Sequence, residues 1–488
     1  MTTVRSDIIA AKLEKKALLE KHFGTAYPAV PKRTHTVAEV QANFDSLETS
    51  KAIVTLVGRV RSVRGMGAIA FAHIEDGSGK FQGVLSSDHI SPELFALFTS
   101  TIEIGDYIEI SGPLFTTKRG EHSVQVSDWR VLSKSLLPFP TEHYGVEDEE
   151  VLLRQRYLDL ALHPTVRDIF VRKAAFWQAV RTFLASQKFL EVQTPVLEHI
   201  PGGAEAEPFT THHNALDQDF YLRISLELAL KRLLVGGYER VFEIGRVFRN
   251  EGIDREHLQE FDHMEFYSAY TDFDTGVAWV EELYRSIVRA VAGETLTTTW
   301  EGHTIDWSKP FPRIDYFAEF QKETGIDLSD EPSIEVLQAK ARELSIKFDP
   351  KVGRGRMIDL IYKKTVRQKL IQPCILIGHP IEVSPLAKSD PTNPRKVLRM
   401  QPIACKSELG NGFSELNDPI EQRVRFEQQM ALRESGDSEA QMLDEDFLAA
   451  LEYGLPPAFG FGMSERLFAV LMDRSIRETV IFPPMRSA

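Results

Sequence analysis

The chain has 488 residues, about three times the length of a typical domain, with 43% hydrophobic and 26% charged residues, as in soluble globular proteins. Its two cysteines, Cys374 and Cys405, exclude a disulfide scaffold and a cysteine-based zinc site. The longest apolar runs are far shorter than the roughly 20 residues that span a bilayer, and the N-terminus lacks the apolar core of a secretory signal. We therefore expect a cytoplasmic protein of two or three domains with no membrane segment.

The net charge of −14, from 57 basic and 71 acidic residues, argues against a generic nucleic-acid coat. The charge is unevenly distributed, because residues 1–64 hold 11 lysines and arginines against 6 acidic residues. A solvated surface is the more common explanation of such an excess, and a local nucleic-acid face is the alternative.

The N-terminal part, residues 1–50, is predicted to be an amphipathic helix followed by a connector. Within 6–22, apolar residues recur at helical spacing with lysines between them, and Pro28 and Pro31 then break the pattern.

Between residues 51 and 136 the pattern changes to the alternation of β-strands. Three strands are expected first, at 53–60, 68–74 and 81–85. A helix at 91–98 and two more strands, at 106–111 and 123–127, complete the pattern. This order predicts a small five-stranded OB-fold barrel, a fold whose face binds oligonucleotides. Four glycines are expected to supply its turns and bulges: Gly58, Gly65, Gly67 and Gly77.

Residues 137–160 have the composition of a linker, with Pro138, Pro140 and Gly145 followed by the acidic run 147–150. We place the domain boundary there.

The remaining residues, 161–488, mix long helices with strands and lack a regular βαβ rhythm. Helices are predicted at 166–188 and after Asp418 and Pro419, a typical N-cap and first-turn pair. Strands are predicted at 221–224, 241–248, 260–270 and 412–415. The pattern favours an α+β domain built on a mainly antiparallel sheet.

No phosphate-binding loop, dinucleotide fingerprint, HExxH or GxSxG motif occurs in the sequence. The most informative segment is the predicted hairpin of residues 241–270, because Arg249 ends its first strand before a charged loop. An arginine fork at this place suits a carboxylate or a phosphate, although a surface arginine on an edge strand is the ordinary alternative.

Three segments resemble the motifs that define class II aminoacyl-tRNA synthetases. The run Phe-Arg-Asn-Glu-Gly at 248–252, with Glu-Phe at 260–261, resembles motif 2. Glu-Val-Gln-Thr-Pro at 191–195 resembles motif 1, and Gly-Phe-Gly-Met-Ser-Glu-Arg at 460–466 resembles motif 3. The motifs would span about 166–195, 241–270 and 460–475.

Further segments narrow the resemblance to bacterial-type class II lysyl-tRNA synthetases; they are 154–160, 200–204, 211–217, 230–233, 408–418 and 482–486. The resemblance implies an anticodon-binding OB-fold and a catalytic domain with an antiparallel β-sheet flanked by helices. It also implies ATP-dependent activation of L-lysine to lysyl-adenylate, transfer to the 3′ end of tRNA(Lys), Mg²⁺ with the ATP, and a homodimer formed through the motif 1 helix.

For the nucleotide, the resemblance implies that Arg249 bridges the substrate carboxylate and the α-phosphate. Arg466 and Phe261 would cover the two faces of the adenine. Glu251 would read the adenine amino group, and His257 would reach the γ-phosphate. Both arginines would be catalytic, because the reaction joins two anions.

For the amino acid, the resemblance implies seven pocket residues: Gly203, Glu227, Glu265, Tyr267, Asn411, Phe413 and Glu415. Glu415 and Tyr267 would hold the ε-ammonium, Glu227 and the backbone of Gly203 the α-ammonium, and Phe413 the aliphatic stem. Such an acidic pocket suits a substrate with two ammonium groups. Taken one at a time, each glutamate would more often be a surface residue.

Three departures from the family pattern concern the metal and the phosphates. Glu408 matches one metal ligand, but Gln401 stands where the family has a second glutamate, so we expect weaker or rearranged Mg²⁺ binding. The glycines of motif 3 are displaced by one residue, so either the turn has shifted or the floor of the ATP site differs. In the motif 2 loop, where the family has an Arg-His pair, Arg255 and Glu256 precede His257. Either Arg255 substitutes as the phosphate ligand after a one-residue slip, or that contact is lost and Glu256 repels the triphosphate.

In the barrel, the resemblance implies that Phe71 and Gln82 read an anticodon base by stacking and hydrogen bonding, while Arg59, Arg61 and Arg64 contact the phosphate backbone. Core packing of Phe71 is the ordinary alternative. Two other functions stay open: a lysine ligase acting on a non-tRNA acceptor, and a tRNA-binding regulatory paralogue with weakened catalysis.

Overall fold

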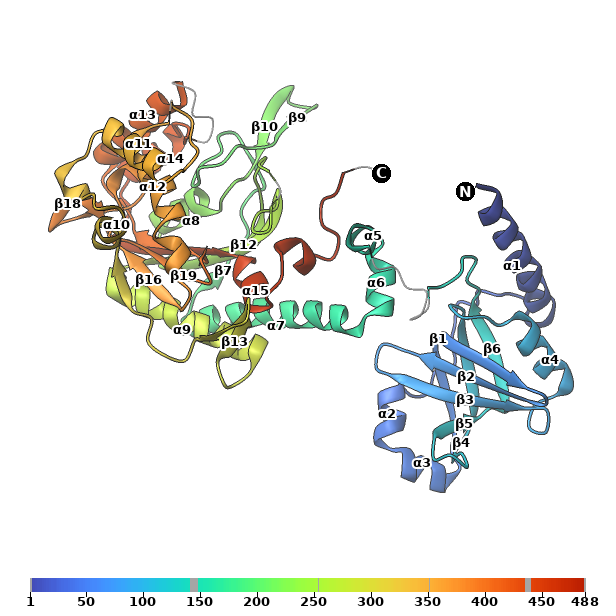
Figure 1. Cartoon of the computed structure of the whole chain (residues 1–488). Helices are drawn as coiled ribbons and strands as arrows, with labels where there is room; N and C mark the ends of the chain where they lie inside the picture. The colour runs from blue at the N-terminus through green and yellow to red at the C-terminus, as the bar shows by residue number, and fades with distance from the viewer. Residues whose placement is uncertain (1, 141–147, 253, 351, 435–439, 487–488) are drawn as a thin grey trace. The chain divides into compact units, whose positions relative to one another are not determined.

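The computed structural model describes residues 2–140, 148–252, 254–350, 352–434 and 440–486 (Figure 1). These residues form two compact units, Met1–Asp148 and Glu149–Ala488, and the division falls within the predicted linker of 137–160. The part of that linker at 141–147 lies outside the described residues. Its C-terminal part is helical, since α5 (Glu149–Arg154) and α6 (Arg156–Leu162) occupy it.

The first unit is a barrel with three helices at its N-terminal side and one inserted helix. Its elements are α1 (Thr2–Phe23), α2 (Val37–Ala42), α3 (Phe44–Ser50), β1 (Ile53–Met66), β2 (Ile69–Glu75), β3 (Lys80–Ser86), α4 (Pro92–Thr101), β4 (Tyr107–Thr116), β5 (His122–Gln125) and β6 (Asp128–Ser133). The strand order is β1-β2-β3-β5-β4-β6, and β1 also pairs with β4, which closes the barrel. A core of alternate apolar residues fills it.

The prediction of five strands was wrong by one, because β6 follows β5 after only two residues and no glycine or proline separates them. Gly58 fits the expected close approach, since a Cβ there would lie 2.7 Å from the backbone oxygen of Glu75. Gly67 has a φ of 61°, the left-handed region that favours glycine. Gly65 and Gly77 face open space, so nothing around them requires glycine.

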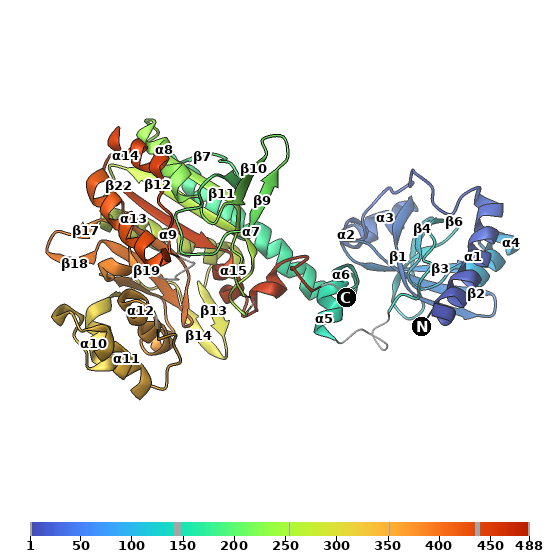
Figure 2. The same cartoon turned by 90° about the horizontal axis from the view of Figure 1, so that it is seen from above.

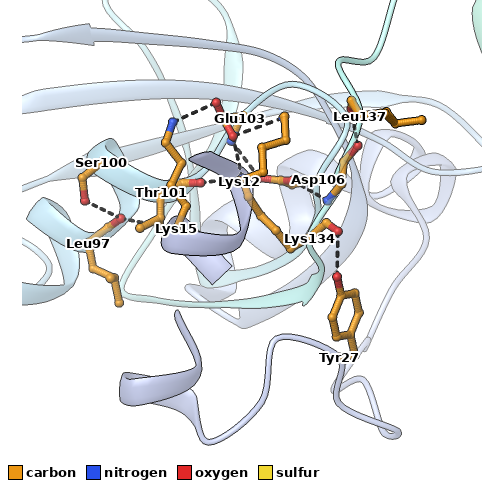
Figure 3. A network of polar contacts seen from close by, with 11 residues as sticks. Lys12, Lys15, Tyr27, Leu97, Ser100, Thr101, Glu103, Asp106, Lys134 and Leu137 are labelled. Atoms are coloured by element: carbon orange, nitrogen blue, oxygen red, sulfur yellow. Dashed lines mark hydrogen bonds and ion pairs between the residues drawn. The ribbon is translucent and has the colours of Figure 1, made fainter. Parts of the chain in front are cut away.

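Helix α1 is attached to the barrel through ion pairs (Figure 3). Glu103 contacts Lys12 at 3.2 Å, Lys15 at 2.8 Å and Lys134 at 2.8 Å, and Lys134 also contacts Asp106 at 2.8 Å. The side chains of Lys134 and Asp106 are fully buried.

The face that α1 buries follows the helical spacing predicted for residues 8, 9, 12, 16 and 19, since Leu19 is fully buried and Lys12 is 8% exposed; Leu13, expected on the same face, is 45% exposed. The lysines of residues 1–64 are accordingly a poorer nucleic-acid face than their number suggests. Glu103 partly neutralises two of them, and Lys16 pairs with Glu20 at 2.7 Å.

The second unit is built on one large, mainly antiparallel sheet, which confirms the predicted α+β class. Its strand order is β15-β16-β19-β21-β22-β12-β11-β7, and β20 pairs with β19. These strands are β7 (Leu190–Glu191), β11 (Arg240–Phe248), β12 (Glu260–Ala269), β15 (Arg313–Asp315), β16 (Cys374–Ile377), β19 (Arg399–Ala404), β20 (Ser407–Glu408), β21 (Asn411–Ser414) and β22 (Ala458–Ser464). Strands β11, β12 and β22 run side by side when the unit is seen from above (Figure 2).

Helices cover both faces of this sheet. Figure 1 shows α7 (Pro164–Ser186) and α9 (Phe273–Ala292) on one side, and α8 (Glu227–Val235), α13 (Pro419–Glu434) and α14 (Glu445–Glu452) on the other. Strand β12 contributes to both layers, since Met264 and Phe266 pack with α7 and α9 whereas Tyr267 packs with α8 and α14. Since successive residues of a strand point to opposite faces, the polar residues that alternate with Met264 and Phe266 point to the sheet face opposite α7 and α9.

The remaining elements of the second unit are short. They are β8 (Leu197–Glu198), β9 (Thr210–His213), β10 (Gln218–Leu222), β13 (Thr297–Trp300), β14 (His303–Asp306), β17 (Ser389–Asp390), β18 (Asn393–Val397), α10 (Tyr316–Thr324), α11 (Ile334–Glu343), α12 (Arg354–Lys364), α15 (Arg466–Leu471), and the 3-10 helices η1 (Leu328–Asp330), η2 (Arg367–Lys369), η3 (Ile381–Val383) and η4 (Ile476–Thr479). Within the described part of the chain, no helix combines the length and the apolar character that crossing a membrane requires.

Candidate active site

A cavity of about 270 Å³ opens in the second unit and brings together ten of the residues singled out in the sequence. These residues are Gly203, Glu227, Arg249, Phe261, Glu265, Tyr267, Glu408, Asn411, Phe413 and Arg466. The first and the last of them, Gly203 and Arg466, are more than 250 residues apart in the chain, and the pairing of the sheet strands brings them together.

The register of three neighbouring strands explains this assembly. Glu265 of β12 pairs with Gly462 of β22, and Tyr267 pairs with Gly460. On the other side of β22, the same two glycines pair with Asn411 and Phe413 of β21. Since residues two apart on a strand share a face, β12, β21 and β22 each present their site residues to the same cavity.

Both glycines of β22 are required by close packing. A Cβ at position 460 would lie 2.2 Å from Oε1 of Glu415 and 2.3 Å from Cε1 of Tyr267, and one at position 462 would lie 3.0 Å from Nε2 of His263. The displaced glycines of motif 3 therefore form the floor of the acidic part of the cavity. The turn at Glu465 follows them, and α15 begins at Arg466.

Glu265 is buried and held by several donors. Its Oε1 accepts hydrogen bonds from Oγ of Ser225 at 2.6 Å and from N of Leu226 at 2.9 Å, and Oε2 accepts one from the hydroxyl of Tyr267 at 2.7 Å. Burial alone would raise the pKa of Glu265, but the contact with His263 and these donors outweigh it and lower the pKa to about 2. Glu265 therefore stays ionised.

Glu227 and Glu415 have a different environment, because a lysine of the chain itself lies between them. Nζ of Lys231 is 2.5 Å from Oε1 of Glu227 and also pairs with Oε2 of Glu415. Burial raises the pKa of Glu227 to about 7, against the attraction of Lys231, and raises the pKa of Glu415 well above its usual range. Glu415 is 1% exposed and is not among the residues that line the cavity.

The two predicted catalytic arginines both line the cavity. Nε of Arg249 donates to the backbone oxygen of Ile224 at 3.3 Å, and its guanidinium lies 5.3 Å from the centre of the Phe261 ring. Burial lowers the pKa of Arg249, and the positive charge of Arg466 lowers it further. Two cations held near each other in a buried site favour an anionic ligand.

Arg466 is positioned by backbone contacts, and no carboxylate among the described residues forms an ion pair with it. It donates from Nε to the backbone oxygen of Glu256 at 3.3 Å and from Nη1 to that of Glu408 at 3.1 Å. The residue before it, Glu465, is buried and forms an ion pair with Lys173 of α7. The motif 3 turn is thereby attached to the motif 1 helix.

The loop of motif 2 between Arg249 and Phe261 contributes none of its predicted ligands to the cavity lining. Glu251 donates its backbone N–H to the oxygen of Arg249 at 2.9 Å, and Nδ1 of His257 lies 2.8 Å from Oδ1 of Asp254. Arg255, a possible substitute phosphate ligand, lies 3.8 Å from Glu301, is 58% exposed, and is also absent from the lining.

Glu256 was expected to repel a triphosphate if a phosphate contact were lost. The structure instead turns its carboxylate to the hydroxyl of Ser407, which donates a hydrogen bond to Oε1.

The two predicted metal ligands are not brought together. Glu408 lines the cavity, whereas Gln401 is 4% exposed, is absent from the lining, and its Oε1 lies 3.0 Å from Nε2 of His379. Burial lowers the pKa of His379 to about 3, so His379 is neutral and donates this bond. No group of three histidine, cysteine, aspartate or glutamate residues suited to a metal ion occurs among the described residues. Of the two predicted ligands, Glu408 is therefore the one that the described structure presents to the cavity.

The predicted anticodon residues lie on the outer surface of the barrel. Ala70, Ala72 and Ile74 of β2 fill the core, so the half-buried Phe71 faces outward, and the core alternative is excluded. Gln82 of β3 shares this face but is 5% exposed, because its Nε2 donates to Oγ of Ser123 at 2.8 Å.

The barrel arginines also have contacts inside the chain. Arg59 donates to the hydroxyl of Tyr107 at 2.7 Å and lies 4.4 Å from the centre of the Phe139 ring. Nε of Arg61 is 2.9 Å from Oε2 of Glu75. A phosphate would have to compete with these partners.

Sequence reasoning missed three residues of the site. Lys231 follows Glu227 by four residues, a helical spacing that brings side chains together and could have revealed the pair. His263 precedes Glu265 by two on β12 and shares its face. Arg399 lines the cavity and donates from Nε to Oδ1 of Asn411 at 2.7 Å, and no local signal predicts this contact between strands.

Comparison with known proteins agrees with this geometry. Residues 148–486 match the family described as tRNA synthetases class II (D, K and N), and residues 54–132 match the OB-fold nucleic acid binding domain. The chain therefore belongs to the class II tRNA synthetases of the D, K and N group, and its second unit is an ATP-using synthetase domain.

Relatives of full length carry one name, lysine–tRNA ligase. That of Moorella thermoacetica is 43% identical over 483 residues, which cover 99% of this chain and 98% of the relative. That of Roseiflexus castenholzii is 46% identical over 463 residues, or 94% of each chain. That of Halalkalibacterium halodurans is 43% identical over 488 residues, or 99% of this chain and 97% of the relative.

Proposed function

We infer that this protein is a lysine–tRNA ligase, which activates L-lysine with ATP to lysyl-adenylate and transfers the lysyl group to the 3′ end of tRNA(Lys). The observation that carries this inference is the composition of the cavity. It combines buried glutamates with two arginines on one sheet face, in a chain whose full-length relatives bear that name.

The chemistry needs positioning and charge neutralisation more than a protein nucleophile. A carboxylate oxygen of lysine attacks the α-phosphorus of ATP, and the bond to pyrophosphate breaks. A hydroxyl of the terminal tRNA ribose then attacks the lysyl carbonyl and releases AMP. We propose that Arg249 neutralises the carboxylate and the α-phosphate as they approach, and that Arg466 holds the nucleotide against Phe261. Glu251 and His257 would contact the adenine and the γ-phosphate after a movement of the motif 2 loop.

For the amino acid, we propose that Glu415 and Tyr267 take the ε-ammonium and that Glu227 and the backbone of Gly203 take the α-ammonium. Phe413 would line the aliphatic stem, with Asn411 and Glu265 completing the pocket. The position of Gly203 supports its role, because its φ of 83° favours glycine, and a Cβ there would come within 2.8 Å of Cβ of Glu227, so only bare backbone fits at this point of the cavity.

Mg²⁺ bound with ATP would supply positive charge to the phosphate oxygens. We propose that Glu408 is its only protein carboxylate and that Gln401 takes no direct part, since the amide oxygen of Gln401 already accepts a hydrogen bond from His379.

We also propose a homodimer formed through α7 and a cytoplasmic location, where the three substrates meet. Exposed apolar residues in the motif 1 region support the dimer, namely Val171, Leu190, Val196 and Leu197. Light scattering of the purified chain tests it, and a monomer at micromolar concentration would contradict it.

The function itself is tested by ATP–pyrophosphate exchange with each of the twenty amino acids, followed by charging of a tRNA(Lys) transcript. We expect exchange with lysine and then lysyl-tRNA. Exchange without charging would favour a ligase for a non-tRNA acceptor. Absence of exchange would favour a regulatory paralogue, the alternative that Gln401 motivates.

The proposed anticodon face gives a separate prediction. Phe71→Ala removes a side chain that we expect to stack on an unpaired base, a contact of about 1–3 kcal/mol. The KM for tRNA should therefore rise roughly ten- to a hundredfold, while lysine-dependent exchange stays unchanged. Equal loss of both activities would show that Phe71 serves the fold of the barrel.

A further inference from the structure

Lys231 is a cation buried beside the proposed amino-acid pocket. It lies on α8, and its side chain is 1% exposed. Its Nζ pairs with Glu227 and Glu415, and lies 5.2 Å from the ring centre of Phe413 and 5.9 Å from that of Tyr267. Together with the ring of Phe447, also 5.9 Å away, two carboxylates and three aromatic rings surround the ammonium group and hold it in place.

This enclosure keeps Lys231 charged. Burial alone would lower its pKa, but the charges of Glu227 and Glu415 and the hydrogen bond to Glu227 outweigh burial and raise it. Lys231 therefore stays charged at neutral pH, and it compensates part of the negative charge that the two glutamates offer to a ligand when they are ionised.

The contact leaves one acceptor unused. Nζ of Lys231 forms an ion pair with Oε2 of Glu415, and no donor among the described residues makes a hydrogen bond to either of the two buried oxygens, which leaves Oε1 with neither kind of contact. This oxygen lies directly behind Gly460, where a Cβ would come within 2.2 Å of it, and Gly460 lines the cavity. A buried carboxylate oxygen without a donor is costly, so Oε1 is suited to an ammonium group that enters over Gly460.

We propose that Lys231 is a positioning and specificity-determining residue: a resident counter-ion that orients Glu227 and Glu415 and leaves them with acceptor capacity for the substrate's ammonium groups. Lys231 touches neither substrate nor reacting atoms in this arrangement, and acts through the two glutamates. This inference rests on the proposed lysine pocket.

The test compares three variants by lysine-dependent ATP–pyrophosphate exchange. Lys231→Met removes the charge but keeps the length, so the two glutamates lose their orientation and one of them protonates. We expect the KM for lysine to rise about ten- to a hundredfold, while the KM for ATP changes less than about threefold. Lys231→Arg keeps a cation and should recover most of the loss. Arg232→Met, on the next residue of α8 with a 40% exposed side chain, is the matched control and should leave both constants unchanged.

If Lys231→Met does not fold, Lys231→Gln replaces it, because glutamine is uncharged but keeps a polar group at the end of the side chain. The KM for lysine should again rise much more than the KM for ATP. An unchanged KM for lysine, an equal rise in both KM values, or no advantage of arginine over methionine would overturn the inference and leave the proposed function standing. Absence of lysine-dependent exchange in the parent protein would overturn both.

Discussion

Glu227 and Glu265 lie in one cavity, yet their pKa values are shifted in opposite directions. Burial raises the pKa of Glu227 to about 7, whereas the donors around Glu265 lower its pKa to about 2. Only Glu227 therefore changes its protonation near neutral pH. A pocket for ammonium groups needs it as a carboxylate, which prevails above its pKa.

This difference predicts how pH affects substrate binding. The KM for lysine should rise as pH falls from 8 to 6, because a growing fraction of Glu227 becomes neutral and loses its attraction for the α-ammonium. Exchange kinetics at several pH values check this, with the KM for ATP as the internal control. A KM for lysine that is flat over this range would contradict the role given to Glu227.

Gly460 offers a steric test of the same pocket. Gly460→Ala places a methyl group against Oε1 of Glu415 and the ring of Tyr267, both buried, and overpacking of this kind costs about 1–3 kcal/mol. We expect the KM for lysine to rise at least about tenfold. Gly77→Ala, where a Cβ meets open space, is the control. Equal kinetics for both variants would show that the lysine does not bind over Gly460.

At the scale of elements, the attachment of α1 to the barrel depends on the carboxylate of Glu103, which contacts three lysines. Burial alone would raise the pKa of Glu103, but the contacts with Lys134, Lys15 and Lys12 outweigh it and lower the pKa from 4.5 to about 2. Since the folded pKa lies below the ordinary one, the contribution of Glu103 to stability is present above pH 4.5 and is lost as pH falls towards 2.

We therefore predict that Glu103→Gln destabilises the first unit by about 1–2 kcal/mol at pH 7, a figure reduced because Glu103 is partly exposed. Thermal unfolding followed by the fluorescence of Trp129, against the exposed Glu14→Gln as control, measures the effect. The difference between parent and variant should shrink at pH 3. An effect that is the same at both pH values would point to packing instead of charge.

At the scale of the whole molecule, the division at 148/149 separates chemistry from tRNA recognition. All residues that line the cavity lie in the second unit. A chain that begins at Glu149 should therefore keep lysine-dependent exchange within about threefold of the parent, while its KM for tRNA rises about a hundredfold or more, since the anticodon contacts are gone. Circular dichroism checks that the shortened chain folds. Loss of exchange in a folded truncation would show that the barrel supports the active site.

The architecture was largely predictable, because it depends on local signals and on recognisable motifs. The alternation in residues 241–270 predicts the hairpin β11–β12, and the Asp418–Pro419 pair predicts the start of α13, as observed. β6 was missed, because only two residues, neither of them glycine or proline, separate it from β5, and the two short strands read as one.

The composition of the cavity was predictable from motifs, but its charge balance was not. Whether Lys231 reaches Glu415 depends on packing between α8 and the end of β21, which lie almost 190 residues apart in the chain. The engagement of Gln401 by His379 is likewise set by neighbouring strands and loops. Pairing between distant segments determines which of the expected side chains are available to ligands.

The unused oxygen of Glu415 has a consequence for translational fidelity. An uncharged amino acid of similar length would leave this acceptor buried and empty, a penalty that can separate a substrate from its hydroxyl- or amine-lacking analogue by about 10⁴- to 10⁵-fold. If lysine binds as proposed, discrimination of that size would be achieved at the first encounter, and norleucine-like competitors would be rejected without a proofreading step.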